Sequence, residues 1–327
     1  MPDTPENQDE WPQQKGQAEG VGFPIARMVT ILSLATGMLA GMNVGPYRGK
    51  ETGETALFRA LLDRFQPGDV FVADRFYCSY FMIALARQRG LDVVMRQHQI
   101  RKMDFRRGKR LGPGDHVVKW IRPARPSWMD EETYDAMPQE LEVREVQVCV
   151  TEPGFRTDTL VVVTTLTDSD TYSAGDIGGL YHQRWSAELD IRTIKCTMGL
   201  DVLRCQSPHM IHRELWAGLL AYNLIRQTIL ETSARSGVPP RSVSFTAALQ
   251  NTGANWTTVL ALSESARILL IDTILKNLKH CRVGHRPGRV EPRAVKRRPK
   301  DHRLLSVPRS QARQDPSWVA GRKKGAK

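Results

Sequence analysis

The chain has 327 residues, enough for one large domain with an insertion or for two modest domains. Its 41% of hydrophobic residues indicates a globular protein and excludes a disordered chain. The formal net charge of +12 is concentrated at one end: residues 276–327 carry 17 Lys and Arg against 3 acidic residues, whereas residues 1–275 carry 30 against 32. Such a basic end is typical of a contact with phosphates, although many basic tails are only solvated.

The five cysteines form no CxxC pair and no even set, which favours thiols in a reducing compartment and a cytoplasmic protein. Cys205, His209 and His212 suggest zinc ligands, but no second cysteine pair completes such a site. Histidines on a helix surface are therefore the preferred interpretation. The chain opens without a signal peptide.

The first elements come after a polar segment. Residues 1–26 are rich in Pro, Gln, Gly and acids and are predicted as loop. The uncharged run between Arg27 and Arg48 is long enough for a membrane span, but its glycines and Asn43 favour two paired strands. We place them at 27–36 and 38–45 and expect no membrane contact.

A βαβ unit is predicted next. An amphipathic helix from Thr52 to Phe65 precedes a buried strand, Val70–Ala73, then a helix at 80–89 and a strand at 91–95. Asp74 directly follows the first of these strands. Ligands of open α/β sheets collect beyond the carboxyl ends of strands, so Asp74 could hold a cation; a cap or turn role is the alternative.

Residues 97–172 have no long helical period and are predicted as a β-rich insertion. Three strand-like runs begin at His116, Leu141 and Thr159. The entry, residues 101–110, gathers six cations around one Asp, as either a solvated loop or a contact with a DNA backbone. Trp120 and Trp128 could stack on an unpaired base, but core positions are preferred for both.

The stretch from Tyr181 to Lys195 contains no Gly or Pro and is predicted as a helix. At about 100° per residue, one face and its flanks carry a carboxylate, three cations and two aromatic residues: Tyr181, Arg184, Trp185, Glu188, Arg192 and Lys195.

That face permits two interpretations. A carboxylate among cations suits a site that holds a metal ion and grips phosphates. The alternative is a solvated stripe of surface ion pairs, since Arg184 and Arg192 each lie four residues from Glu188. Three apolar residues point elsewhere and are expected to be buried: Leu189, Ile191 and Ile194.

The spacing Tyr-x2-Arg-x3-Glu-x6-Lys resembles the signature of bacterial DDE transposases of the insertion-sequence-four branch, in which an aromatic residue such as Trp185 also follows the Arg. Further segments share the resemblance, which covers most of the chain: Gly45–Lys50, Ala73–Phe76 and Arg289–Lys296.

The resemblance implies an α/β, RNase H-like mixed sheet flanked by helices. Its core would comprise residues 27–96 and 173–281, the insertion would separate these two parts, and residues 282–327 would form a basic extended arm. Helices are expected at 208–235 and 258–280, packed under the signature helix.

The resemblance also implies the chemistry. Asp74 and Glu188 would bind two Mg²⁺ ions, or Mn²⁺, and so act as catalytic carboxylates. Arg184 and Lys195 would hold phosphates, Tyr181 would hydrogen-bond a phosphate, and Trp185 would support a displaced base. The substrate would be double-stranded DNA, transposon ends and target, cut and joined within a dimeric complex.

One part of the family pattern is not matched. The family's first catalytic Asp lies on a strand ahead of the predicted pair, whereas Asp3, Glu6, Asp9 and Glu10 sit in a Pro-rich segment. We therefore expect an N-terminally truncated transposase whose sheet lacks its central strand. The alternatives are a catalytically inactive DNA-binding remnant and a metal-dependent nuclease of the same fold.

Overall fold

The structure, a computed structural model, describes residues 1–16, 18–149, 159–284 and 305–314. In chain order the elements are α1 (Pro5–Glu10), β1 (Ala26–Leu32), β2 (Leu39–Pro46), α2 (Glu54–Arg59), the 3₁₀ helix η1 (Leu62–Arg64), β3 (Val70–Ala73), α3 (Tyr80–Gln88), β4 (Asp92–Arg96), β5 (Lys109–Gly112), β6 (Asp115–Ile121), α4 (Glu131–Asp135), β7 (Glu140–Cys149), β8 (Thr159–Thr164), α5 (Ala174–Gln183), α6 (Trp185–Arg192), the π-helical turn η2 (Thr193–Thr197), α7 (Pro208–Ser236), the 3₁₀ helix η3 (Pro240–Ser242), α8 (Phe245–Ala261), α9 (Glu264–Leu278) and α10 (Arg309–Gln314).

The first two strands form an antiparallel hairpin, from Ala26 opposite Pro46 to Leu32 opposite Leu39. The prediction of two paired strands in this uncharged run is therefore confirmed, with a longer turn than expected. Across the described parts of the chain, no helix is both long enough and apolar enough to span a membrane.

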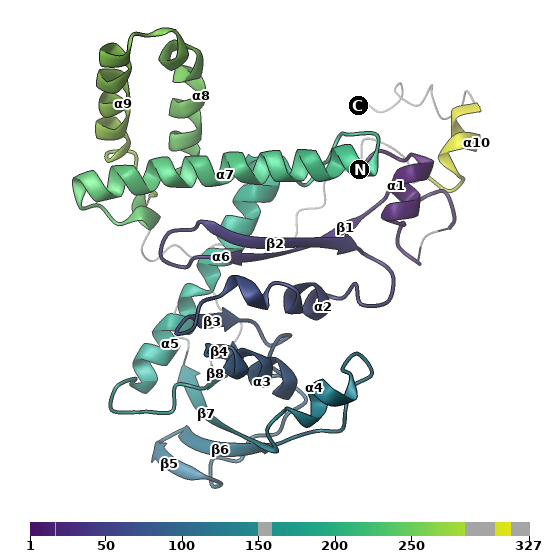
Figure 1. The fold of residues 1–327 in the computed structure, drawn as a ribbon, viewed down its shortest axis with the longest axis vertical. Helices are drawn as coiled ribbons and strands as arrows, with labels where there is room; N and C mark the ends of the chain where they lie inside the picture. The colour runs from purple at the N-terminus through teal and green to yellow at the C-terminus, as the bar shows by residue number, and fades with distance from the viewer. Residues whose placement is uncertain (17, 150–158, 285–304, 315–327) are drawn as a thin grey trace, which may run out of the picture.

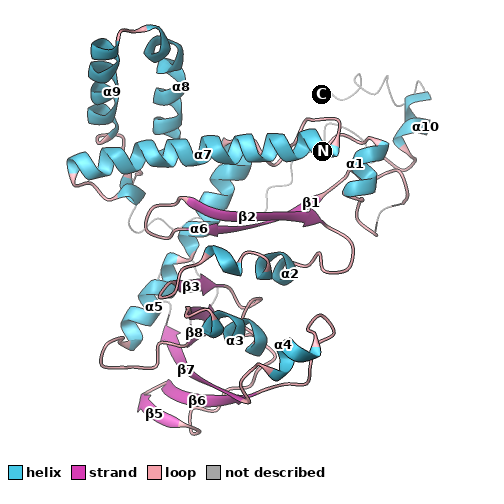
Figure 2. Cartoon of the chain, viewed as in Figure 1, coloured by secondary structure: helices cyan, strands magenta, loops and turns pink. Residues whose placement is uncertain are grey.

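The other six strands form one mixed sheet in the order β3-β4-β8-β7-β6-β5 (Figure 2). β3 and β4 are parallel, and the remaining pairs are antiparallel. β8 lies between β4 and β7, so the strands of the predicted insertion extend the core sheet. The predicted α/β class with a mixed sheet flanked by helices is confirmed.

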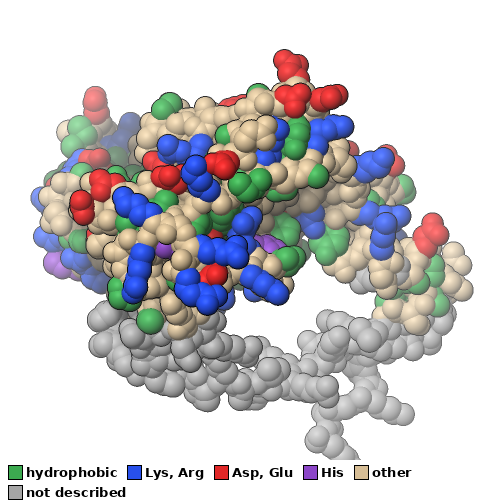
Figure 3. Space-filling view, turned by 90° about the horizontal axis from the view of Figure 1, so that it is seen from below, with side chains coloured by type: hydrophobic (Ala, Val, Ile, Leu, Met, Phe, Trp, Pro, Cys, Tyr) green, Lys and Arg blue, Asp and Glu red, His purple; other side chains and the backbone are tan. Residues whose placement is uncertain are grey.

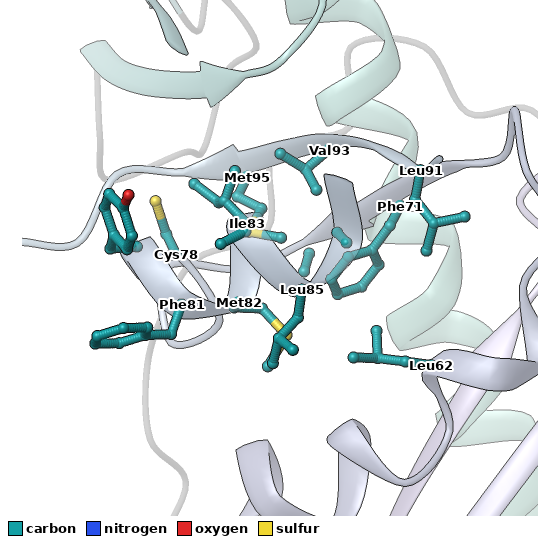
Figure 4. Close-up of a cluster of buried hydrophobic side chains, with 14 of the residues drawn as sticks. Leu62, Phe71, Cys78, Phe81, Met82, Ile83, Leu85, Leu91, Val93 and Met95 are labelled. Atoms are coloured by element: carbon teal, nitrogen blue, oxygen red, sulfur yellow. The ribbon is translucent and has the colours of Figure 1, made fainter. Parts of the chain in front are cut away.

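Helices cover both faces of this sheet around β4. Val93 and Met95 pack with α3 in one apolar cluster, shown in Figure 4, and both are fully buried. Val94, between them, packs with Ile177 and Tyr181 of α5 in another cluster. Alternate strand residues point to opposite faces, so β4 is buried on both faces by α3 and α5. This explains its continuous apolar sequence.

The hairpin and the six-stranded sheet are separate sheets within the described residues (Figure 1). β3 is an edge strand, and a pocket of about 400 Å³ lies between it and β1. Thr30 and Leu32 line the pocket from the hairpin, and Val70 and Val72 line it from β3. This pocket separates the two sheets, and the predicted absence of a central strand stays a prediction.

The prediction of loop for residues 1–26 is wrong at Pro5–Glu10, which form α1 with Thr4 as its N-cap. Trp11 ends this helix, is 1% exposed, and packs with Ile211 and Leu215 of α7. A single aromatic residue in a polar segment produces no apolar period, and sequence patterning therefore missed it.

Several predicted helices have different ends. The helix predicted from Thr52 to Phe65 is divided into α2 and η1. The helix predicted at 208–235 is confirmed as α7, whereas the one at 258–280 is two helices, α8 and α9, separated at Leu262–Ser263. α8 and α9 pack against each other and against α7.

Most of the predicted extended arm, residues 282–327, lies outside the described residues, as does the Arg289–Lys296 motif. Its described part contains a helix, α10, so the prediction of an extended arm is wrong there. Arg309 pairs with Asp3 at 3.1 Å, and its guanidinium carbon lies 3.4 Å from the centroid of the Phe23 ring. These contacts fix α10 beside the N-terminal segment.

Candidate active site

Asp74 lies at the carboxyl end of β3, as predicted. The parallel register sets Ala73 beside Met95, so Asp74 and Arg96 come together where β3 and β4 end. The Asp74 side chain is exposed and its Oδ1 accepts a hydrogen bond from the Phe76 backbone N–H at 2.8 Å. A carboxylate is therefore presented at the sheet edge where ligands of α/β proteins collect.

The signature stretch is helical throughout but not regular. α5 ends at Gln183, α6 begins at Trp185, and η2 follows from Thr193. A π-turn is wider than an α-turn, so the residues of η2 rotate away from the positions that an ideal helix assigns. The single regular helix predicted from Tyr181 to Lys195 is wrong in this respect.

Tyr181, Arg184 and Glu188 form a connected group. Arg184 Nη2 donates to Glu188 Oε1 at 2.7 Å, and its guanidinium carbon lies 5.8 Å from the centroid of the Tyr181 ring. Burial alone would lower the pKa of Arg184, but its contacts with Glu188 and Tyr181 raise it overall. Glu188 is the most exposed member of this ion pair, with 43% of its side chain accessible.

Tyr181 connects this group to the end of β3. It is 8% exposed and belongs to the apolar cluster that Val72 joins from β3, two residues before Asp74. Burial raises the pKa of Tyr181; the Arg184 and Arg96 charges oppose the shift, and the Asp74 charge adds to it. The charges of Asp74 and Arg184 therefore both act on Tyr181, and Glu188 is bound to Arg184.

Lys195 and Trp185 lie less centrally. Arg184 lines the pocket between β1 and β3, whereas Lys195 lines a different cavity of about 960 Å³, together with Arg27 and Arg204. Trp185 is 48% exposed. The shared face predicted for Arg184 and Lys195 is thus divided between two pockets, and binding of DNA by Lys195 and Trp185 stays a prediction.

Comparison with known proteins decides the family. The family model of the transposase DDE domain matches residues 2–224, more than half of the chain. The chain belongs to this family. It is similar to transposase InsG for insertion sequence element IS4 of Escherichia coli (strain K12), with 26% identity over 307 residues, 91% of this chain and 65% of InsG. It is also 35% identical over 82 residues to the transposase for insertion sequence element IS421 of Escherichia coli, which is 25% of this chain and 21% of that protein.

The predicted DDE transposase family is confirmed. The mixed α/β architecture is consistent with the RNase H-like fold expected for a DDE transposase. The chain spans less than two thirds of the length of InsG.

The acids of this transposase-family chain suit a divalent metal only in part. Carboxylate oxygens are the donors that Mg²⁺ prefers, and Asp74 and Glu188 both offer them at exposed positions. However, within the described ranges no three His, Cys, Asp or Glu side chains come together in a way that could hold a metal ion. Metal binding by Asp74 and Glu188 therefore stays a prediction.

A buried acid of the same helix was missed by sequence reasoning. Asp190 is 2% exposed, whereas Leu189, predicted to be buried, is 51% exposed; Ile194 is fully buried as predicted. Asp190 accepts hydrogen bonds from Arg226 of α7 and from Arg241 Nη1, the latter at 2.7 and 2.8 Å. Both arginines follow in the sequence, but no local spacing connects them to Asp190.

These arginines extend the network to the hairpin. Arg241 donates to the Ser33 and Leu34 carbonyl oxygens at 2.8 Å each. Arg226 Nε donates to the Tyr222 hydroxyl at 3.0 Å, and that hydroxyl donates to the Gly37 carbonyl oxygen at 2.7 Å. The network fixes α6, which carries Glu188, against α7 and the turn between β1 and β2.

Proposed function

We propose that this chain is the catalytic region of a DNA transposase, with Asp74 and Glu188 as two of its metal-binding carboxylates. The observation that supports this most directly is the packing of Tyr181 at the end of β3. Tyr181 contacts Arg184, and Arg184 binds Glu188, which supports a place for the second acid near the end of the sheet where Asp74 lies.

Each side chain has a distinct role in this proposal. Mg²⁺ ions bound by Asp74 and Glu188 would activate the attacking water or 3′-hydroxyl and stabilise the leaving oxygen. Arg184 holds the Glu188 carboxylate through a hydrogen bond and offers further guanidinium N–H groups to a phosphate beside the scissile one. Tyr181 remains a neutral phenol, because its pKa is raised, and so retains an O–H to donate.

A third carboxylate would complete such a site, and within the described residues none joins Asp74 and Glu188. The substrate in this proposal is double-stranded DNA, both transposon ends and target, bound by a dimer.

The incomplete group of acids favours a second candidate, a protein that binds DNA without cutting it. Incubating the chain with DNA that carries the ends of its own element, with and without Mg²⁺, separates the possibilities. Strand transfer would support the transposase. Unspecific cutting would support a metal-dependent nuclease, and salt-sensitive binding without cutting would support the DNA-binding protein.

Substitutions of Asp74 and Glu188 test whether these two acids bind the metal ions. Asp74→Asn and Glu188→Gln each remove one charge and should abolish Mg²⁺-dependent cleavage. Glu231→Gln, at an exposed ion pair on α7, is the matched control and should cleave like the unchanged chain. If the unchanged chain cleaves and Asp74→Asn cleaves equally well, Asp74 is not a metal ligand.

A further inference from the structure

A basic pocket of about 280 Å³ lies beside the candidate site, between the end of β4 and the first residues of the insertion. Three arginines line it, Arg75, Arg96 and Arg101, and none of its described lining residues is acidic. We call it the arginine pocket. It lies next to the basic entry of the insertion. Lys and Arg side chains gather on the face of the molecule that Figure 3 shows.

The arginine pocket adjoins the proposed chemistry at two points. Arg75 directly follows Asp74 in the chain, and Arg96 ends β4 beside it. The charge of Arg96 also acts on Tyr181, which contacts Arg184. A strand of DNA with its scissile phosphate at Asp74 therefore carries its neighbouring phosphates past this pocket.

The arginines are held in place by neutral partners. Arg75 Nη1 donates to the Gln99 side-chain oxygen at 3.0 Å. The guanidinium carbon of Arg101 lies 3.6 Å from the centroid of the Trp120 ring, a close cation–π contact. These contacts hold two of the three guanidinium groups, and neither contact is an ion pair with a carboxylate. The charge of Glu145 nevertheless acts on Arg101 from behind the lining.

Behind the pocket, one buried acid organises this arrangement. Glu145 is 4% exposed and accepts hydrogen bonds from Trp120 Nε1 at 3.0 Å and Gln97 Nε2 at 3.3 Å, while its other oxygen lies 3.0 Å from His116 Nε2. Glu145 thereby orients the ring under Arg101. It lies behind the lining and does not occupy it.

We propose that the arginine pocket binds one backbone phosphate of the DNA strand that runs through the active site, an inference that rests on the proposed function. Planar guanidinium groups match the two free oxygens of a phosphodiester and bind them with paired N–H donors. A neutral ligand would not need three positive charges with no acidic residue among the described lining, so these charges favour an anion. The role is positioning of the substrate, separate from the metal-binding acids.

The test is DNA binding of the full chain, measured by fluorescence anisotropy with a labelled duplex across a series of NaCl concentrations. Removing one phosphate contact should lower the slope of log K against log salt by about 0.9. Arg96→Gln and Arg101→Gln should each weaken binding about tenfold. Arg89→Gln is the control, since Arg89 pairs with Asp63 and lies outside the pocket.

Each outcome decides the matter. If Arg96→Gln and Arg101→Gln bind with the affinity and slope of Arg89→Gln, the arginine pocket does not hold a phosphate of DNA. Lysine at either position should keep the slope but lose part of the affinity, and this charge-conserving variant serves if a glutamine variant does not fold.

The source of the phosphate is also tested. If millimolar inorganic phosphate raises the melting temperature of the chain through these arginines while the DNA slope is unchanged, the pocket takes a free anion and the inference fails. If the unchanged chain binds no DNA, both the proposed function and this inference fail. If the unchanged chain binds DNA and the arginine variants bind it like their control, the inference alone fails.

Discussion

Replacing Asp190 by alanine should destabilise the protein strongly. The substitution removes the carboxylate that compensates Arg226, which is 5% exposed, and Arg241, whose side chain is 25% exposed. Removing one partner of a buried ion pair costs about 3–5 kcal/mol, because the remaining charge is left without compensation. Arg241 can recover water, whereas Arg226 cannot, so the cost comes chiefly from Arg226.

Urea denaturation followed by circular dichroism measures the free energy of unfolding of this variant. Glu231→Ala is the matched control: it removes an exposed i,i+4 pair with Arg235, which is worth about 0.3–0.5 kcal/mol. Asp190→Asn, which keeps an acceptor but no charge, should fall between them. Equal free energies for Asp190→Ala and the control would refute the idea that Asp190 anchors α6.

The remaining predictions concern a thiol and two glycines. Burial raises the pKa of Cys78 to about 12, so Cys78 should resist Ellman's reagent at pH 8 in the folded protein while exposed Cys196 reacts; equal labelling rates would contradict this. Because the unfolded thiol ionises near pH 8.5, the contribution of Cys78 to stability is complete below that pH and is lost as pH rises toward 12, and Cys78→Ser should flatten this decline. Gly237→Ala, at φ +67° with open space around the new Cβ, should cost about 1 kcal/mol of backbone strain. Gly108→Ala should cost clearly more, since its Cβ would lie 2.1 Å from a backbone oxygen of β6; urea denaturation measures the free energy of unfolding of both variants.

The fold was predictable wherever a local pattern coincided with burial. The apolar run Val70–Ala73 is a strand of a βαβ unit, in which Phe71 and Ala73 pack in one apolar cluster and Val72 in another. The apolar period of 208–235 is α7. Trp120 is 3% exposed, as the preference for a core position predicted, whereas the same prediction is wrong for Trp128, which is 36% exposed. In each case neighbouring residues carry the information.

The candidate site was predictable only in part, for the same reason. The positions of Tyr181, Arg184 and Glu188 follow from helix geometry, and their ion pair has the spacing that sequence indicates. The burial of Asp190 depends on Arg226 and Arg241, which lie 36 and 51 residues away. Lys195 lies in the π-helical turn η2 and lines a different pocket from Arg184. The sequence pattern predicts a regular helix there and does not indicate this turn.

The place of β8 within the sheet constrains how the protein can assemble. Val94 lies opposite Thr164, 70 residues later, so the inner edge of β4 stays exposed during synthesis until the whole insertion has emerged from the ribosome. Closing a loop of this length is slow compared with forming the adjacent helix. Nascent chains that stop before Thr159 should therefore present an open, apolar strand to chaperones and proteases, and deletions inside the insertion should cost the β3–β4 unit its stability.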